Sequence, residues 1–103
     1  MEQDFISKAF SDMQENGWDI NGPLIWGFFF ISENKENLAK IFNELKDHNY
    51  KIEEIRECDG KWRLWVSKVE VLTEDKLRRR KEAFNELAAY YNSEFDGWDV
   101  GRE

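Results

Sequence analysis

Apolar side chains recur along the chain with two different periods, which predict helices and strands. The period of about 3.6 residues that is typical of an amphipathic helix occurs in three segments, 4–15, 34–48 and 74–92. Residues that favour the N-cap position precede the last two segments, within 32–34 and at Thr73. We therefore expect three helices, each with one apolar face.

Between these helices the pattern is that of β-strands. The run from Leu24 to Ile31 is apolar in both alternating frames, which predicts a central strand covered on both faces. Residues 50–57 predict a second, charged strand, and residues 61–72 a long third strand. The tail over residues 95–100 could add a short last strand.

The third strand changes frame along its length. Its apolar residues occupy one frame up to Val66 and the opposite frame from Val69 onward. Because an extra residue in one strand shifts the side-chain alternation, we expect a bulge or a sharp twist near Ser67-Lys68.

The order of the elements predicts a single α+β domain over residues 1–103. Without the first helix the order is βαββαβ, that of a ferredoxin-like two-layer sandwich with a four-stranded antiparallel sheet. Its spatial strand order, 4-1-3-2, makes the two most apolar strands central. The charged second strand becomes an edge, where charges discourage pairing with other chains.

Composition restricts the function. The net charge of −7 has the wrong sign for a nucleic-acid binder, which needs cations to displace phosphate counterions, whereas it suits a basic protein partner. With only one cysteine no intrachain disulfide can form. The chain opens without a signal-peptide pattern, and its longest apolar run is too short to span a bilayer. We expect a cytoplasmic protein, a monomer or weak dimer, with no membrane and no direct nucleic-acid contact.

No set of residues indicates catalysis. His48 lies at an expected helix end, where a cation is simply favourable. Cys58 is flanked by Glu57 and Asp59, whereas a nucleophilic thiol needs positive surroundings. No zinc spacing, calcium loop or phosphate-binding loop is present. We expect no enzyme activity, no cofactor and no metal.

Two features could serve binding. Residues 76–81 hold five basic side chains, which a helix spreads around itself as a basic collar. This collar could touch RNA or neutralise acidic neighbours from the first helix. The second feature is the sheet face that carries Arg63 and Trp65 beside Phe29, and these residue types are frequent interface anchors. An open sheet with aromatics can also stack RNA bases, and core filling under the first helix is the alternative to any binding role.

The ending Phe95-Asp96-Gly97-Trp98-Asp99-Val100-Gly101, after a helix that ends Ala88-Ala89-Tyr90-Tyr91, resembles the RraB family, regulators of ribonuclease activity B. The early Gly17-Trp18-Asp19 fits the same layout. The resemblance implies a ferredoxin-like domain that inhibits the bacterial endonuclease ribonuclease E by binding it. The chain lacks the very acidic extensions of well-known members. An immunity protein that neutralises a toxin nuclease is the alternative on the same fold. The candidate protein-interface residues are Phe29, Arg63, Trp65, Asp96, Trp98 and Asp99.

Overall fold

The computed structural model describes residues 5–102. It contains three α-helices, one short 3-10 helix and four strands within that range. In chain order they are α1 (Phe5–Glu15), β1 (Leu24–Ser32), α2 (Lys35–Leu45), η1 (Lys46–His48), β2 (Lys51–Cys58), β3 (Lys61–Glu70), α3 (Glu74–Tyr90) and β4 (Glu94–Gly101).

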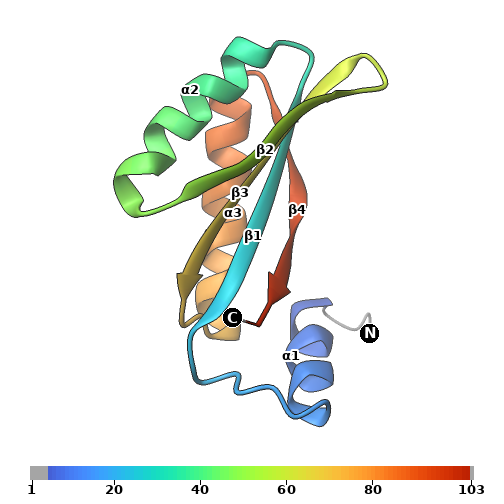
Figure 1. The fold of residues 1–103 in the computed structure, drawn as a ribbon, viewed down its shortest axis with the longest axis vertical. Helices are drawn as coiled ribbons and strands as arrows, with labels where there is room; N and C mark the ends of the chain where they lie inside the picture. The colour runs from blue at the N-terminus through green and yellow to red at the C-terminus, as the bar shows by residue number, and fades with distance from the viewer. Residues whose placement is uncertain (1–4, 103) are drawn as a thin grey trace.

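The four strands form one antiparallel sheet in the order β2-β3-β1-β4 (Figure 1). This is the predicted order 4-1-3-2 read from the other side, so the α+β assignment and the ferredoxin-like topology are confirmed. The apolar strands β1 and β3 are central, and the charged strand β2 is an edge. β4 is longer than predicted and forms the other edge.

All three α-helices pack on one face of the sheet. Phe10 of α1 stacks on Trp26 of β1 with 5.8 Å between ring centroids. Phe84 of α3 meets Phe28 edge-on at 4.9 Å. Trp26 and Phe28 have no exposed surface, and Lys35 at the start of α2 lies over Trp62 on this same side. The prediction that the first strand is covered on both faces was therefore wrong.

The opposite face of the sheet, here called the open face, carries none of these helices. Since side chains alternate along a strand, the β1 residues between the buried ones point to it. Ile25, Phe29 and Ile31 accordingly remain only half-buried. Apolar residues in both frames thus mark one helix-covered core and one uncovered apolar surface.

The expected bulge near Ser67-Lys68 was also wrong in position. β3 pairs with β1 without a break from Trp62 to Glu70. The register shifts occur in the two edge strands instead, between Ile52 and Glu54 in β2 and opposite the step from Phe29 to Phe30 in β4. Bulges at edges bend the strand and disturb pairing with foreign chains.

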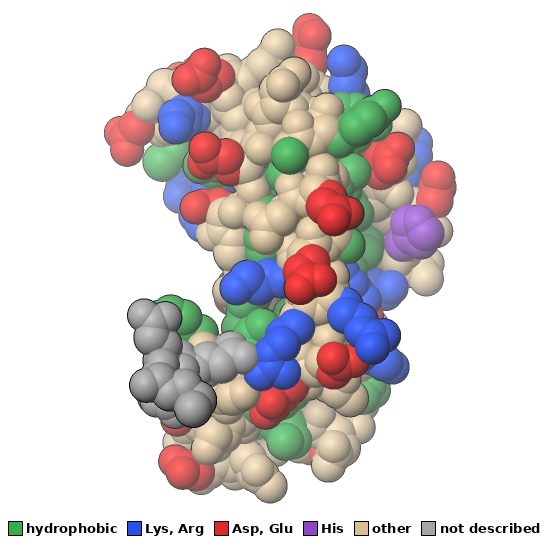
Figure 2. All heavy atoms as spheres, turned by 180° about the vertical axis from the view of Figure 1, so that it is seen from behind, with side chains coloured by type: hydrophobic (Ala, Val, Ile, Leu, Met, Phe, Trp, Pro, Cys, Tyr) green, Lys and Arg blue, Asp and Glu red, His purple; other side chains and the backbone are tan. Residues whose placement is uncertain are grey.

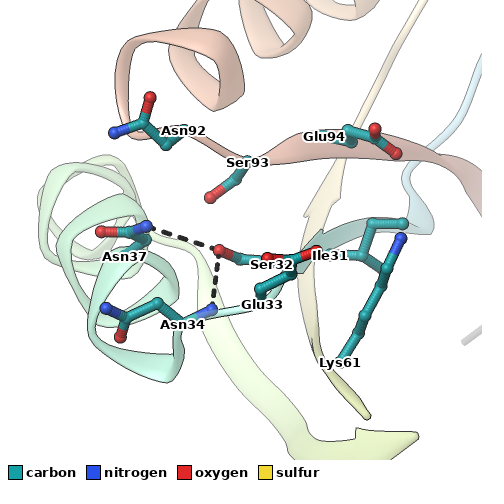
Figure 3. Close-up of a pocket in the computed structure, with 9 residues that line it drawn as sticks. All are labelled: Ile31, Ser32, Glu33, Asn34, Asn37, Lys61, Asn92, Ser93 and Glu94. Atoms are coloured by element: carbon teal, nitrogen blue, oxygen red, sulfur yellow. Dashed lines mark hydrogen bonds between the residues drawn. The ribbon is translucent and has the colours of Figure 1, made fainter. Parts of the chain in front are cut away.

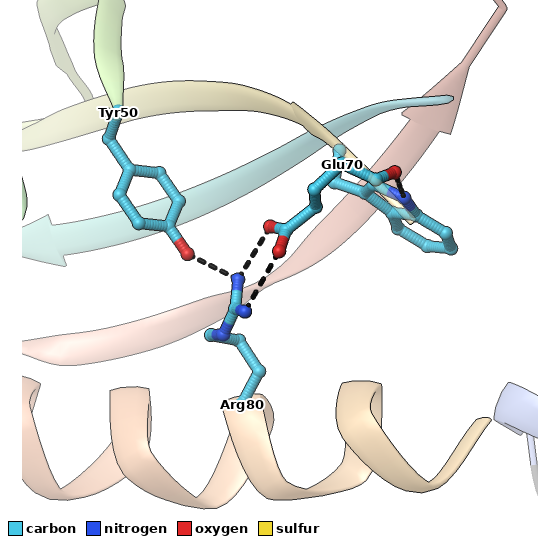
Figure 4. A network of polar contacts seen from close by, with 4 residues as sticks. Tyr50, Glu70 and Arg80 are labelled. Carbon is cyan, nitrogen blue, oxygen red and sulfur yellow. Dashed lines mark hydrogen bonds and ion pairs between the residues drawn. The ribbon is translucent and has the colours of Figure 1, made fainter. Parts of the chain in front are cut away.

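One polar cluster ties the helical layer to the sheet (Figure 4). Arg80 of α3 donates to both carboxylate oxygens of Glu70, at 2.7 and 3.0 Å, and also to the Tyr50 hydroxyl just before β2. The backbone carbonyl of Glu70 accepts a hydrogen bond from the Trp26 indole at 3.1 Å. Burial raises the pKa of Tyr50 to about 12, although the Arg80 charge acts in the opposite direction. This cluster fixes α3 against β3 and so supports the sheet from the helical side.

Candidate functional site

An aromatic pair lies at the centre of the open face. Phe29 of β1 is paired in register with Trp65 of β3, and their rings stack with centroids 5.8 Å apart at 21°. The guanidinium of Arg63 lies over the Phe29 ring, 4.2 Å from its centroid. A cation over an aromatic face is attracted by the ring quadrupole. The three residues form a compact cluster of the kind that anchors protein interfaces.

The β4 edge brings two carboxylates to this cluster. Arg63 Nη2 lies 3.5 Å from Asp96 Oδ2. Asp99 is paired with Gly27, next to Phe29 on β1. Burial raises the pKa of the Asp99 carboxyl, while the Arg63 charge and the Gly27 backbone oppose that rise. A carboxylate held in a partly desolvated position, beside a cation, is a feature that functional sites often show.

Two nitrogen donors on this face have no hydrogen-bond partner within the part of the chain described. They are the ring nitrogen Nε1 of Trp65 and the Nε of Arg63, both buried as atoms. A hollow of about 160 Å³ lies beside them, between Phe29, Glu54, Arg56, Arg63 and Trp65. Buried donors normally have partners, so this part of the face has hydrogen-bonding capacity that intramolecular contacts leave unused.

Charges surround the aromatic centre unevenly. On the β2 side they largely compensate one another, because Lys51 lies 3.1 Å from Glu53 and Arg56 lies 3.6 Å from Glu54. The hydroxyl of Ser67 donates to Glu53 at 2.8 Å, and this bond together with Lys51 lowers the pKa of Glu53. β4 contains acidic residues and no basic residue. The open face therefore has an apolar centre, a compensated rim at β2 and an acidic rim at β4.

The six candidate interface residues are divided between two faces. Phe29, Arg63, Trp65, Asp96 and Asp99 meet on the open face, as the contacts above show. Trp98 points to the helical side and packs on Trp26, with centroids 5.9 Å apart. The bulge in β4 causes this division, since Asp96 is the extra residue between Phe95 and Gly97. The sequence pattern did not mark Gly27 as a site residue. A glycine is needed there because the Asp99 carboxylate occupies the space that a Cβ at this position would fill.

The basic collar lies on the other side of the molecule. Figure 2 shows its cations around the first half of α3, with carboxylates beside them. Arg79 pairs with Asp75 at 3.1 Å, and Arg78 with Glu74 at 3.7 Å. Arg80 points inward to Glu70. The carboxylates in these three contacts belong to α3 and β3, whereas the prediction had placed them in the first helix. Because α3 covers the helical face, the collar and Trp65 cannot contact one nucleic-acid strand together on a single face.

The residues considered for catalysis are both exposed and lie far apart along the chain, since His48 precedes β2 and Cys58 is its last residue. His48 lines a hollow of about 330 Å³ with Glu44 and Tyr50. Cys58 lines a different hollow, of about 500 Å³, with Trp62 and Asp96. No group of three metal-binding side chains occurs among residues 5–102. Neither hollow brings a histidine and a thiol together.

A further polar hollow of about 460 Å³ lies where β1 ends and α2 begins (Figure 3). The Ser32 hydroxyl accepts hydrogen bonds from the Asn34 backbone at 3.2 Å and from the Asn37 amide at 3.5 Å. Asn34 in turn caps α2 by accepting from the Glu36 backbone. These polar groups are already engaged in starting the helix. The hollow is a structural feature of the α2 N-terminus.

Comparison with known proteins identifies one family. The family model described as Regulator of ribonuclease activity B matches residues 3–100. No curated protein matches the chain significantly. Within residues 5–102, no helix has both the length and the apolar character needed to cross a membrane.

Proposed function

The chain belongs to the family of regulators of ribonuclease activity B, and on that premise we propose that it inhibits an endonuclease of the ribonuclease E type by binding it through the open face. The proposal places this action in the bacterial cytoplasm, where it slows RNA decay. The chain acts by association alone, as a regulator without a catalytic step of its own.

The observation that supports the open face as the docking surface is the aromatic and arginine cluster at its centre. Phe29, Trp65 and Arg63 form a stacked cluster on the sheet face that none of the helices within residues 5–102 covers. Interfaces concentrate aromatic residues and arginine at the centre and place polar groups at the rim.

Electrostatics favours a protein partner over RNA. The chain carries −7 overall, and three arginines of its basic collar are paired with carboxylates or directed inward. A phosphate backbone would be repelled by the acidic rim of β4. An endonuclease must present cations where it holds RNA, so an acidic regulator is attracted to that region and can hinder RNA from reaching it.

Affinity capture tests the proposal. The full chain, immobilised through a C-terminal tag, is exposed to lysate of its own source organism, and bound proteins are identified by mass spectrometry. The proposal predicts recovery of the ribonuclease E-type endonuclease by the wild-type chain. Recovery should fall at least tenfold for Arg63→Glu and for Trp65→Ala, each shown to be folded by circular dichroism.

Arg79→Ala is the matched control, since Arg79 lies in the collar on the helical side and its pair with Asp75 is highly exposed. It should capture the nuclease as the wild type does. Failure of the wild-type chain to capture the nuclease contradicts the proposed partner. Equal capture by the folded Arg63→Glu and Trp65→Ala variants contradicts the proposed face.

A further inference from the structure

The outer side of β4 is a strand edge without a partner in the described chain. β4 is last in the sheet order β2-β3-β1-β4 and pairs with β1 alone. In Figure 1 it borders the sheet, with α1 near its C-terminal end. Such an edge presents unpaired backbone N–H and C=O groups to other chains. Addition of an extended segment to an open edge is a common mode of peptide recognition.

The two edges of the sheet differ in how far they discourage pairing. Each edge strand contains one bulge, at Glu53 in β2 and at Asp96 in β4, so the difference between the two edges lies in their charges. β2 combines charges of both signs, including the Lys51–Glu53 ion pair. β4 carries Glu94, Asp96 and Asp99 and no cation. An edge with acidic residues alone repels acidic strands but attracts basic ones. The charges of β4 therefore favour a basic strand, whereas the mixed charges of β2 favour neither sign.

Two of the three β4 carboxylates form no salt bridge within the described chain, and of these Asp99 lies against Gly27 and within reach of the Arg63 charge. Asp96 already contacts Arg63, whereas Glu94 and Asp99 form no salt bridge within residues 5–102. A second copy of this chain is a poor occupant, because β4 paired with β4 would set two acidic rows side by side, and like charges across strands are destabilising.

Glycines on β4 open a route from this edge to the aromatic centre. Gly97 is paired with Phe29 and Gly101 with Ile25, both on the open face. A Cβ at either glycine would meet nothing within 4 Å. Side chains of a strand added next to β4 can therefore lean across these positions, and one of them can reach the ring of Phe29.

From the unpaired edge, its acidic charges and the open space at Gly97 and Gly101, we propose that β4 receives an extended, positively charged segment of the protein partner as a fifth strand. The inference rests on the proposed function for the identity of the partner. The segment spans up to eight residues of β4. Its lysine or arginine side chains pair with Glu94 and Asp99, and an apolar side chain passes over Gly97 to Phe29.

Amide hydrogen exchange of the full chain measures this addition directly. The probe is a ten-residue synthetic peptide in which arginine alternates with valine. We expect it to slow exchange of the backbone amides of β4, with little change at β2, and to bind more weakly as salt is raised. The charge-reversed peptide with glutamate in place of arginine should give no protection.

A peptide with proline in place of each valine is the matched control for backbone pairing, since it keeps every arginine but cannot donate the same ladder of hydrogen bonds. It should bind at least tenfold more weakly. The double variant Glu94→Gln, Asp99→Asn should also bind the arginine-valine peptide about tenfold more weakly. The control Glu57→Gln, on the β2 edge, should bind it unchanged.

Equal binding of the proline peptide, or protection at β2, overturns the inference. Protection of β4 that grows with protein concentration in the absence of peptide also overturns it, because the occupant is then a second copy. A parallel exchange experiment with the purified endonuclease separates the two proposals. Protection of β4 by the peptide but no binding of the nuclease retains the edge site and rejects the partner. Nuclease binding without protection at β4 retains the partner and rejects the edge site.

Discussion

Gly27 and Asp99 face each other across the β1–β4 pair, and the Asp99 carboxylate occupies the space that a Cβ on Gly27 would need. The indole nitrogen of Trp65 also lies close, 2.8 Å from that Cβ position. Gly27 therefore lets a carboxylate and an aromatic ring approach the centre of the open face from the two neighbouring strands. This contact links the acidic rim to the aromatic cluster.

Gly27→Ala should lower the free energy of unfolding by about 1–3 kcal/mol, the usual cost of an extra methyl group in a well-packed site. The methyl group must displace Asp99, Trp65 or both. In the double variant Gly27→Ala, Asp99→Ala the loss should be smaller than the sum of the two single effects, because the colliding carboxylate is gone. Urea unfolding of the four proteins measures the coupling. Additive effects would show that the two residues do not compete for space.

Asp99→Asn should make the folded chain more stable at neutral pH. Burial raises the pKa of Asp99 in the folded state, so the folded state disfavours the charged carboxylate relative to the unfolded state. This cost is present above the folded pKa and fades as pH falls through it. The advantage of the asparagine variant should therefore shrink in acid. Thermal unfolding at neutral and acidic pH tests this, and an advantage that grows in acid contradicts it.

The Arg80–Glu70 pair should contribute far more to stability than the collar pairs. Its side chains are 23% and 15% exposed, against 78% and 68% for Arg79 and Asp75. Arg80→Ala leaves a carboxylate unpaired in a partly buried place and should cost about 2–3 kcal/mol. Arg79→Ala should stay within about 0.5 kcal/mol of the wild type. Equal losses of unfolding free energy in Arg80→Ala and Arg79→Ala, measured by urea unfolding, would contradict this difference.

Tyr50 should make the fold sensitive to alkali. Its pKa in the folded state is about 12, whereas an unfolded tyrosine titrates near about 10. The unfolded state loses the proton first, so the free energy of unfolding falls as pH rises from about 10 towards 12. The slope is at most about 1.4 kcal/mol per pH unit. Tyr50→Phe should lack this part of the decline, and urea unfolding at about pH 9 and about pH 11 compares the two. A decline of the same steepness in both proteins contradicts the assignment.

The sequence pattern predicted the strand order because charge and apolarity were distributed unequally among the strands. Leu24 to Ile31 is too apolar for an edge, and the charges of β2 fit no central position. Local capping was also visible, since Thr73 accepts a hydrogen bond from the Lys76 backbone at 3.1 Å. These features depend on neighbours in sequence or on strand-wide averages.

What the pattern could not show depends on single residues and on distant partners. A strict alternation places Asp96 and Trp98 on one face and Asp99 on the other. The bulge instead puts both aspartates on the open face and Trp98 against Trp26. An apolar frame also looks the same whether a helix or a partner covers it. Only the structure therefore shows that one face of β1 is not covered by a helix of the described chain.

The rate at which a purified ribonuclease E-type endonuclease cleaves RNA, measured against increasing amounts of this chain, tests the central claim most directly. The account predicts that the wild-type chain slows cleavage to saturation, that Arg79→Ala does the same, and that folded Trp65→Ala and Arg63→Glu require at least tenfold more protein. An unchanged cleavage rate with the wild-type chain, or equal inhibition by all four proteins, would contradict it.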